Sequence, residues 1–200
     1  MNEVREFFDR LAEEWDTRPG HSELDPKWFK SLLEEIGITE NMRVVDLGCG
    51  TGAIIPYLLE KIGEGGVIYA VDISSRMLEK LREKFPHKNI YCYNIPAEEM
   101  DAIGASVDAI ICHNTFPHVE DKRRCLLSAA KILKKGGAFL ISHHGSRDEI
   151  NRFHIEHGYP ISKHLIPEDG EMRRLFLSAG FGDVVISDTP SSYVALARRL

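Results

Sequence analysis

One short stretch, residues 44–52, combines an acid with closely spaced glycines and indicates where a ligand binds. It reads V-V-D-L-G-C-G-T-G, so Asp46 stands two residues before the first of three alternating glycines. Glycines let a backbone approach a ligand closely, and the amides at the start of a helix point toward whatever lies there. A second acid, Asp72, follows about 20 residues later, where an acid can bind a ribose. The pattern predicts a site for a nucleotide-like ligand.

The position of Asp46 separates two classes of such ligands. Residues 48–53 formally fit G-x-G-x-x-[G/A], which by itself admits NAD. A carboxylate at the mouth of the turn repels a diphosphate, but it attracts an ammonium or sulfonium group. S-adenosylmethionine carries both cations together with a ribose, whose hydroxyls can donate hydrogen bonds to Asp72. The acid therefore favours S-adenosylmethionine over a dinucleotide.

Histidines are the second group that could do chemistry. Seven of the nine lie between residues 113 and 164, namely His113, His118, His143, His144, His154, His157 and His164. The first four follow predicted strands whose ends open on the ligand crevice of a doubly wound sheet. In one hypothesis they shape the substrate site or supply a general base, His118 first and then His143 or His144.

Two other interpretations of these histidines stay open. His143, His144, His154 and His157, with Glu156, could bind a metal ion that orients a chelating substrate. Alternatively, the segment is a polar lid with ordinary surface histidines. The catalytic residue, if there is one, is not fixed by the sequence.

An alternation of strands and helices must position these side chains. The predicted strands are residues 43–47, 67–72, 89–93, 107–112 and 138–142, and the helices between them are residues 52–62, 74–85 and 119–133, with a turn at 134–137. This spacing predicts a parallel sheet with right-handed crossovers. Residues 182–187 and 192–197 have only a four-residue link, which predicts an antiparallel hairpin. We therefore expect an α/β, Rossmann-like, three-layer doubly wound sheet of seven strands, the last antiparallel.

Two amphipathic segments precede the first strand. Residues 3–16 have an apolar helical face, and Asp25-Pro26 predicts the N-cap and first residue of a second helix. We expect one domain over residues 1–200: N-terminal cap helices (1–37), a cofactor-binding core (43–142), a histidine-rich lid (143–166) and a C-terminal helix with a hairpin (167–200). Residues 1–28 and 143–166 should together cover the substrate.

Composition narrows the setting. The 25 basic and 31 acidic residues give a net charge of −6, which argues against broad attraction to nucleic acid or an anionic membrane. No apolar run approaches the ~20 residues of a membrane span. The four cysteines form no C-x-x-C pair, and the start of the chain does not look like a signal peptide. We expect buried free thiols and a cytoplasmic protein.

Several motifs, in the right order, resemble those of class I S-adenosylmethionine-dependent methyltransferases. Residues 44–52 are similar to the family's first motif, Y-A-V-D-I-S at 69–74 to the second-strand motif, V-D-A-I-I-C-H-N at 107–114 to the fourth-strand motif, and L-K-K-G-G at 133–137 to the turn before strand five. F-D-R-L-A-E-E-W-D at 8–16 is similar to the opening of small-molecule members, including quinone methyltransferases.

The resemblance implies roles for individual residues. The glycine turn would pack under the methionine part, Asp72 would hold the ribose, and Pro96 replaces an acid that often reads the adenine. The implied cofactor-binding residues are Asp46, Gly48, Cys49, Gly50, Thr51, Gly52, Asp72, Ile73, Met77, Ala97, Glu98 and His113.

The implied reaction is in-line methyl transfer to a small molecule, which leaves S-adenosylhomocysteine, by a monomer or homodimer that does not bind nucleic acid. Two alternatives remain: an NAD(P)-dependent oxidoreductase, which would not explain Asp46, and a non-catalytic S-adenosylmethionine-binding module. The sequence does not reveal the acceptor or the atom methylated.

Overall fold

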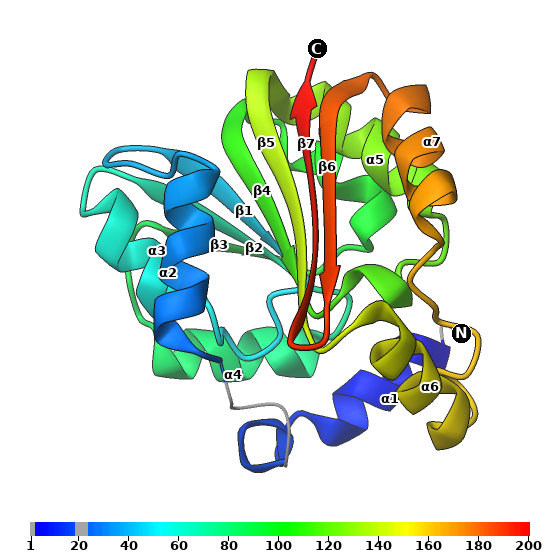
Figure 1. The fold of residues 1–200 in the computed structure, drawn as a ribbon. Coiled ribbons are helices and arrows are strands. Elements are labelled where there is room, and N and C mark those ends of the chain that lie inside the picture. The colour runs from blue at the N-terminus through cyan, green and yellow to red at the C-terminus, as the bar shows by residue number, and fades with distance from the viewer. Residues whose placement is uncertain (1–2, 19–23) are drawn as a thin grey trace.

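A seven-stranded sheet with the order β3-β2-β1-β4-β5-β7-β6 forms the centre of the computed structural model, which describes residues 3–18 and 24–200 (Figure 1). The strands are β1 (Arg43–Leu47), β2 (Val67–Val71), β3 (Ile90–Tyr93), β4 (Val107–His113), β5 (Leu133–His144), β6 (Phe181–Thr189) and β7 (Ser192–Arg199). Strands β1 to β5 pair in parallel, and β7 is antiparallel to both β5 and β6. The predicted sheet, its seven strands and its antiparallel last strand are confirmed.

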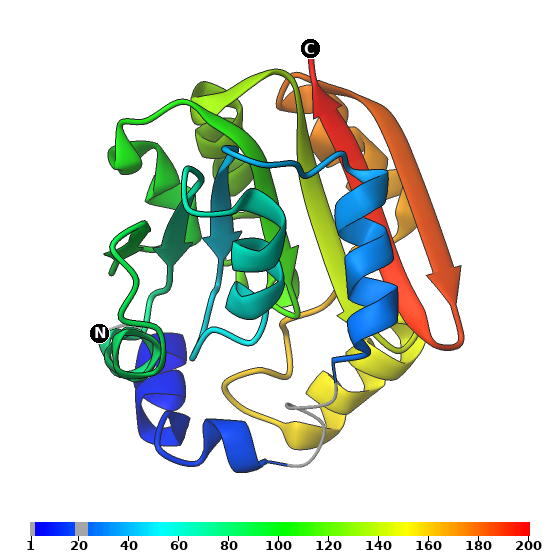
Figure 2. The same cartoon turned by 90° about the vertical axis from the view of Figure 1, so that its left-hand side faces the viewer.

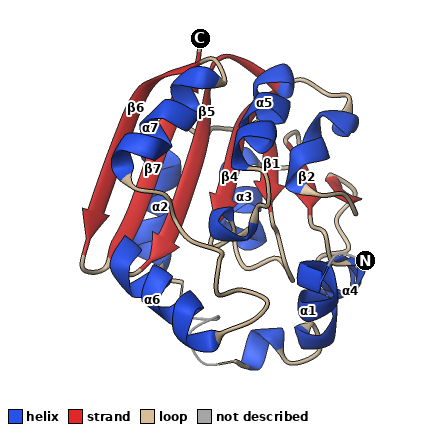
Figure 3. Cartoon of the chain, turned by 90° about the vertical axis from the view of Figure 1, so that its right-hand side faces the viewer, coloured by secondary structure: helices blue, strands red, loops and turns tan. Residues whose placement is uncertain are grey.

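Helices cover both faces of the sheet, which makes three layers. Residues of α2 (Pro26–Glu35), α3 (Ile55–Ile62) and α4 (Ser75–Lys84) share one hydrophobic cluster, on the face turned to the viewer in Figure 2. Residues of η2 (Ala97–Ile103), α5 (Lys122–Ile132) and α7 (Asp169–Ser178) share the other, on the face seen in Figure 3. Alternate residues of β1 serve the two clusters, Val44 one and Val45 the other. Both faces are buried, so Val44, Val45 and Leu47 are apolar although their side chains point to opposite faces.

Chain connectivity places the ligand crevice at the ends of β1 and β4. From β1 the chain moves outward to β2 and β3, and then returns to the other side of β1 as β4. Ligands bind at such a reversal, beyond the carboxyl ends of the strands. Two helices far apart in sequence, α1 (Glu3–Leu11) and α6 (Arg147–His157), lie beyond this end of the sheet (Figures 1 and 3).

Several predicted boundaries differ from the structure. The separate turn at residues 134–137 is wrong, because β5 already begins at Leu133 and its register with β4 shifts at this point, with Gly136 at a φ of 74°. Helix α5 begins at Lys122 rather than residue 119, since the Asp121 side chain accepts a hydrogen bond from the Arg124 amide and caps the helix there. Helix α3 begins at Ile55, after a turn of the glycine segment.

The N-terminal segment is only partly the continuous helix that was expected. Helix α1 ends at Leu11, and a short 3₁₀ helix, η1 (Trp15–Thr17), follows. Residues 1–2 and 19–23 of the predicted cap lie outside the described residues. Asp25 caps α2 as predicted, accepting a hydrogen bond from the Lys27 amide at 2.9 Å.

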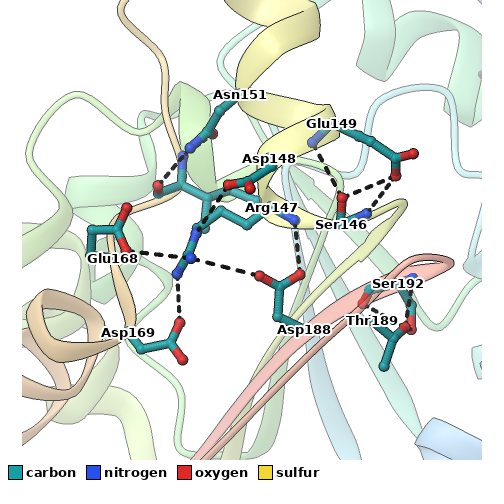
Figure 4. Close-up of polar contacts among 11 residues, drawn as sticks. Ser146, Arg147, Asp148, Glu149, Asn151, Glu168, Asp169, Asp188, Thr189 and Ser192 are labelled. Atoms are coloured by element: carbon teal, nitrogen blue, oxygen red, sulfur yellow. Dashed lines mark hydrogen bonds and ion pairs between the residues drawn. The ribbon is translucent and has the colours of Figure 1, made fainter.

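A network of ion pairs anchors the start of α6 to the C-terminal elements. The Arg147 guanidinium lies 2.7 Å from Asp169, 3.3 Å from Glu168 and 3.8 Å from Asp188, which belong to α7, its N-cap and β6 (Figure 4). The helix opens with a capping box between Ser146 and Glu149. These contacts fix where α6 leaves β5. Within residues 3–18 and 24–200, every helix is too short or too polar to cross a bilayer.

Candidate functional site

A cavity of about 870 Å³ opens beyond the ends of β1 and β4. Its walls come from α1, the turn after β1, the end of β2, η2, the ends of β4 and β5, and α6. Two parts can be distinguished. The acidic half contains Asp46, residues 48–51 of the glycine turn and Asp72, and the histidine half contains His113, His118, His143, His144 and His154.

The glycine turn is shaped by close packing of its own neighbours. Gly48, Gly50 and Gly52 all have positive φ, at 72°, 51° and 94°. A Cβ on Gly48 would lie 2.0 Å from Thr115 Cγ2, so only glycine fits there. Thr115 also donates a hydrogen bond to the Gly48 carbonyl at 3.1 Å. The residues after β4 therefore hold the turn, a contact that the motif alone does not predict.

Asp46 is a buried acid with an unsatisfied oxygen. Its exposed fraction is 2%, and Oδ2 has no hydrogen-bond partner in the described part of the chain. Burial and the nearby Asp72 raise its pKa well above the ordinary value. An orphaned buried polar atom costs folding free energy unless a ligand satisfies it. The cavity at this point fits a cationic group.

Asp72 joins the second strand to the glycine turn. Its Oδ2 accepts a hydrogen bond from the Gly50 amide and its Oδ1 one from the Ser74 amide, both at 2.8 Å. Burial raises its pKa to about 6, although the two amides oppose the change. Each oxygen keeps a further lone pair, so Asp72 serves the helix start and can still accept bonds from hydroxyls.

Apart from His113, which lies in the histidine half, the remaining predicted cofactor contacts line the cavity with one exception. Ile73, Met77, Ala97 and Glu98 are all on the cavity wall. Glu98 Oε1 accepts a hydrogen bond from the Asp121 amide at 2.8 Å, which orients this carboxylate from α5. The exception is Gly52: it is absent from the wall, and a Cβ there would meet the ring of Phe85 at 2.7 Å. Packing explains this glycine.

His113, His118, His143 and His144 all line the cavity, and the histidines form two groups, of which the first contains His113 and His144. The rings of His113 and His144 have centroids 5.4 Å apart, and Trp28 of α2 lies 4.8 Å from His144. His113 Nδ1 is 2.9 Å from Ser142 Oγ.

The second group combines three segments. His118, at the end of η3 (Phe116–His118), has its ring 4.9 Å from His154 of α6 and 5.3 Å from His164. Its Nδ1 lies 3.1 Å from His164 Nδ1.

Burial keeps these rings uncharged at neutral pH. It lowers the pKa of His113 to about 3 and that of His118 and His143 well below the usual value. Burial is also the main cause that lowers the pKa values of His154 and His164. The interpretation as ordinary surface histidines does not fit this group, because the side chains of His113, His143 and His154 are at most 9% exposed. Only His157 among the lid candidates is exposed, with its ring against Phe153.

The metal hypothesis finds no ligand set in the part of the chain that the structure describes. No three His, Cys, Asp or Glu side chains there are placed to hold a metal ion. His143, His144, His154 and His157 all lie on the cavity wall.

Sequence reasoning missed two acids that tie the N-terminal segment to the acidic half. Asp9 accepts a hydrogen bond from Ser74 Oγ at 2.6 Å, and Asp16 accepts one from Thr51 Oγ1 at 2.5 Å. Phe8 packs against His118 with ring centroids 5.1 Å apart. The paired acids and hydroxyls are 65 and 35 residues apart in sequence, so no local pattern could reveal them.

Comparisons with known proteins agree with this geometry. A family model described as a methyltransferase domain matches residues 38–174. A ubiquinone/menaquinone biosynthesis C-methyltransferase of Pectobacterium carotovorum is 31% identical over 148 residues, which cover 72% of this chain and 58% of that protein. A demethylmenaquinone methyltransferase of Tropheryma whipplei is 28% identical over 141 residues, with 70% and 58% covered. The chain thus spans less than two thirds of these relatives.

Solved structures show the same fold. A SAM dependent methyltransferase from Aquifex aeolicus has a TM-score of 0.72 at 24% identity, with 96% of this chain and 98% of that chain covered. A phosphoethanolamine N-methyltransferase of Haemonchus contortus, in complex with S-adenosyl-L-methionine, has a TM-score of 0.75 at 14% identity, with 100% and 60% covered.

Proposed function

Because the chain belongs to the methyltransferase domain family, we propose that it transfers a methyl group from S-adenosylmethionine to a small-molecule acceptor. S-adenosylhomocysteine would be the other product. The proposal covers one domain: N-terminal cap helices (1–37), a cofactor-binding core (43–142), a histidine-rich lid (143–166) and a C-terminal helix with a hairpin (167–200).

The observation that carries this proposal is the unpartnered Asp46 oxygen beside the glycine turn. An ammonium or sulfonium group would satisfy that oxygen and offset the cost of its burial. A pyrophosphate would instead bring negative charge toward both Asp46 and Asp72. The acidic half therefore supports S-adenosylmethionine over a nicotinamide dinucleotide.

The residues that would hold the cofactor follow from the cavity wall. Asp46 would face its cationic part, Asp72 the ribose hydroxyls, and Ile73 with Met77 the adenine. When bound, the cofactor supplies an already activated methyl group. The neutral rings of the histidine half add no positive charge that would repel a sulfonium.

The chain itself must then place the acceptor and exclude water. Aromatic side chains of α1 and α6, such as Phe8 and Phe153, line the cavity opposite the sheet. Alignment of two reactants in a closed site supplies much of the rate in such transfers. The N-terminal segment and residues 143–166 would act together as the cover.

The acceptor is proposed to be a small molecule rather than a nucleic acid. The chain carries a net charge of −6, and the cavity is lined by apolar and neutral groups in its histidine half. Because the relatives named above are quinone methyltransferases, a quinol ring is the first acceptor to test. Four free thiols support the cytoplasm as the proposed location, and we propose a monomer or homodimer.

Calorimetry on the purified chain tests the cofactor assignment. We expect S-adenosylmethionine and S-adenosylhomocysteine to bind and NADH not to bind. Binding of NADH alone would replace the proposal with the oxidoreductase alternative. Turnover with a panel of quinols, phenols and amines then separates an enzyme from a non-catalytic module, which would bind the cofactor and methylate none of them.

A further inference from the structure

His154 is held in one defined protonation form. Its Nδ1 lies 2.5 Å from the backbone carbonyl oxygen of His164. A carbonyl can only accept a hydrogen bond, so Nδ1 must carry the proton. Burial lowers the pKa of the ring, which is therefore neutral, and its second nitrogen, Nε2, must have a free lone pair.

That lone pair belongs to a residue on the cavity wall. His154 is only 6% exposed, lines the cavity and lies beside His118. Within residues 3–18 and 24–200, the ring of His154 makes its hydrogen bond through Nδ1, to the His164 carbonyl, and none through Nε2. His154 thus presents a basic nitrogen whose tautomer the fold has already selected.

The two segments that make this contact are tied together by a second side chain. Asn151, one turn before His154 on α6, donates from Nδ2 to the Ile166 carbonyl at 3.0 Å. Its Oδ1 accepts a hydrogen bond from the Ile166 amide at 2.7 Å. The ion pairs of Arg147 hold the start of the same helix, next to Asn151 in Figure 4. The segment that follows His164 is therefore fixed relative to the part of α6 that precedes His154.

His118 is less well defined. Its Nδ1 faces His164 Nδ1, and either nitrogen can donate, so both tautomers of His118 are allowed. His154 is locked by a group that cannot donate. His157 Nδ1 also bonds to a carbonyl, that of Phe153 at 2.9 Å, but the His157 side chain is exposed, whereas that of His154 is buried.

We propose that His154 is the general base of the reaction, and that the acceptor is a neutral molecule with a weakly acidic hydroxyl of the phenol or enol class. The inference rests on the proposed methyl transfer. The acceptor oxygen forms its bond to the methyl carbon while the carbon–sulfur bond breaks, and that electron pair stays on sulfur. The hydroxyl proton passes to His154 Nε2, so the sulfonium charge is replaced by an imidazolium charge. His164 and Asn151 are positioning residues.

The groups around His154 favour this role at neutral pH. They are His118 and His143 of the cavity wall, His164, His157 on the same helix, and Lys122 of α5. Burial lowers the pKa of His154, the hydrogen bond to the His164 carbonyl raises it, and His157 and Lys122 add to the lowering. No acid is among them, so the ring stays unprotonated and able to accept a proton, and it returns the proton readily afterwards.

The test uses His154→Asn, in which an amide nitrogen can still donate to the His164 carbonyl but no base remains. With 1,4-naphthalenediol as acceptor, we expect turnover to fall by ~10²-fold or more while S-adenosylmethionine affinity stays within about threefold. The acidic limb of the pH profile of kcat should disappear as well. His87→Asn, an exposed histidine outside the cavity, is the matched control and should match the wild type.

A second measurement needs neither cofactor nor acceptor. Nitrogen-15 NMR of the ligand-free chain should show His154 as the neutral, Nδ1-protonated tautomer. An Nε2-protonated ring, or turnover of His154→Asn within a few-fold of the wild type, would overturn the inference. Failure of the wild-type chain to bind S-adenosylmethionine would instead contradict the proposed function. Calorimetry measures this binding independently of the role of His154.

Discussion

Both halves of the cavity bury ionisable side chains, which are carboxyl groups in the acidic half and imidazole rings in the histidine half. In the acidic half, burial raises the pKa of Asp72 to about 6, and in the histidine half it lowers that of His113 to about 3. Backbone amides hold the acid, whereas a hydroxyl of a neighbouring strand holds the histidine. Burial therefore disfavours the charged form of the titratable groups in each half.

The comparison teaches what a ligand has to supply. A cation that enters the acidic half favours the ionised forms of Asp46 and Asp72, while the histidine half needs no counter-charge. The first half is built to gain from binding a cation, and the second is built to accept or donate hydrogen bonds.

The largest effect should come from the pH dependence of the histidine half. His113 has a pKa of about 3 when folded and about 6.5 when unfolded, so the unfolded chain binds more protons below pH 6.5. The stability that this residue gives at pH 7 is therefore lost as pH falls from 6.5 to 3, by as much as about 4 kcal/mol. His113→Asn removes that loss, which urea unfolding at pH 7, 5 and 4 would measure.

The acidic half should give the opposite dependence of the free energy of unfolding on pH. Asp72 has a pKa of about 6 when folded against 3.8, so the folded chain binds more protons between these values and stability falls as pH rises through them. If His113→Asn left the slope below pH 6.5 unchanged, the histidine half would not be buried in the neutral form.

The next effect concerns the turn that supports the acidic half. Gly48→Ala would put a Cβ 2.0 Å from Thr115 at a φ of 72°, so strain and overlap should together cost about 3 kcal/mol. Gly136→Ala is the matched control, because its φ is 74° but nothing lies within 4 Å of the new Cβ. It should cost about 1 kcal/mol. Equal losses in thermal unfolding would show that the Thr115 contact does not shape the turn.

How far the sequence could predict each half follows from how that half is built. Asp46, the glycines and Asp72 lie in two short segments, and parallel pairing of β1 with β2 places them side by side. The fold class and this half of the site were therefore predictable from strand spacing and local turn chemistry. Gly52 was assigned to the ligand because spacing alone cannot separate a packing glycine from a binding one.

The histidine half could be predicted only in outline. Strand ends indicated that His113, His118, His143 and His144 would meet, and they do line one cavity. The roles proposed for His154 and His164 depend on a hydrogen bond from the His154 ring on α6 to the backbone carbonyl of His164 in the following loop. No sequence pattern predicts this bond. Contacts between separate elements depend on how whole helices, strands and loops pack. A single hydrogen bond of this kind is therefore seen only in the three-dimensional structure.

A smaller effect tests the unsatisfied acid directly. Asp46→Asn keeps the shape but removes the charge, and should weaken S-adenosylmethionine binding by about 2 kcal/mol, the range for hydrogen bonds to charged groups. Because burial and Asp72 raise the pKa of Asp46, a bound cation should favour its ionised form, and cofactor binding to the wild type should release protons. Calorimetry in buffers of different ionisation enthalpy measures both. Unchanged affinity and proton release in Asp46→Asn would remove this acid from the cofactor site.

The smallest effect concerns the link between the N-terminal segment and the acidic half. Thr51→Val removes the hydroxyl that donates to Asp16 at 2.5 Å, while Asp16 keeps its ion pair with Lys84 at 2.8 Å. The loss should be about 1 kcal/mol and should appear as faster amide exchange in α1 and η1, with the sheet unaffected. Thr17→Val is the control, since its exposed hydroxyl bonds only within its own turn, to the Glu14 carbonyl. Protection of α1 that is equal in both variants would mean that apolar packing of Phe8, not the Thr51 contact, holds this helix over the cavity.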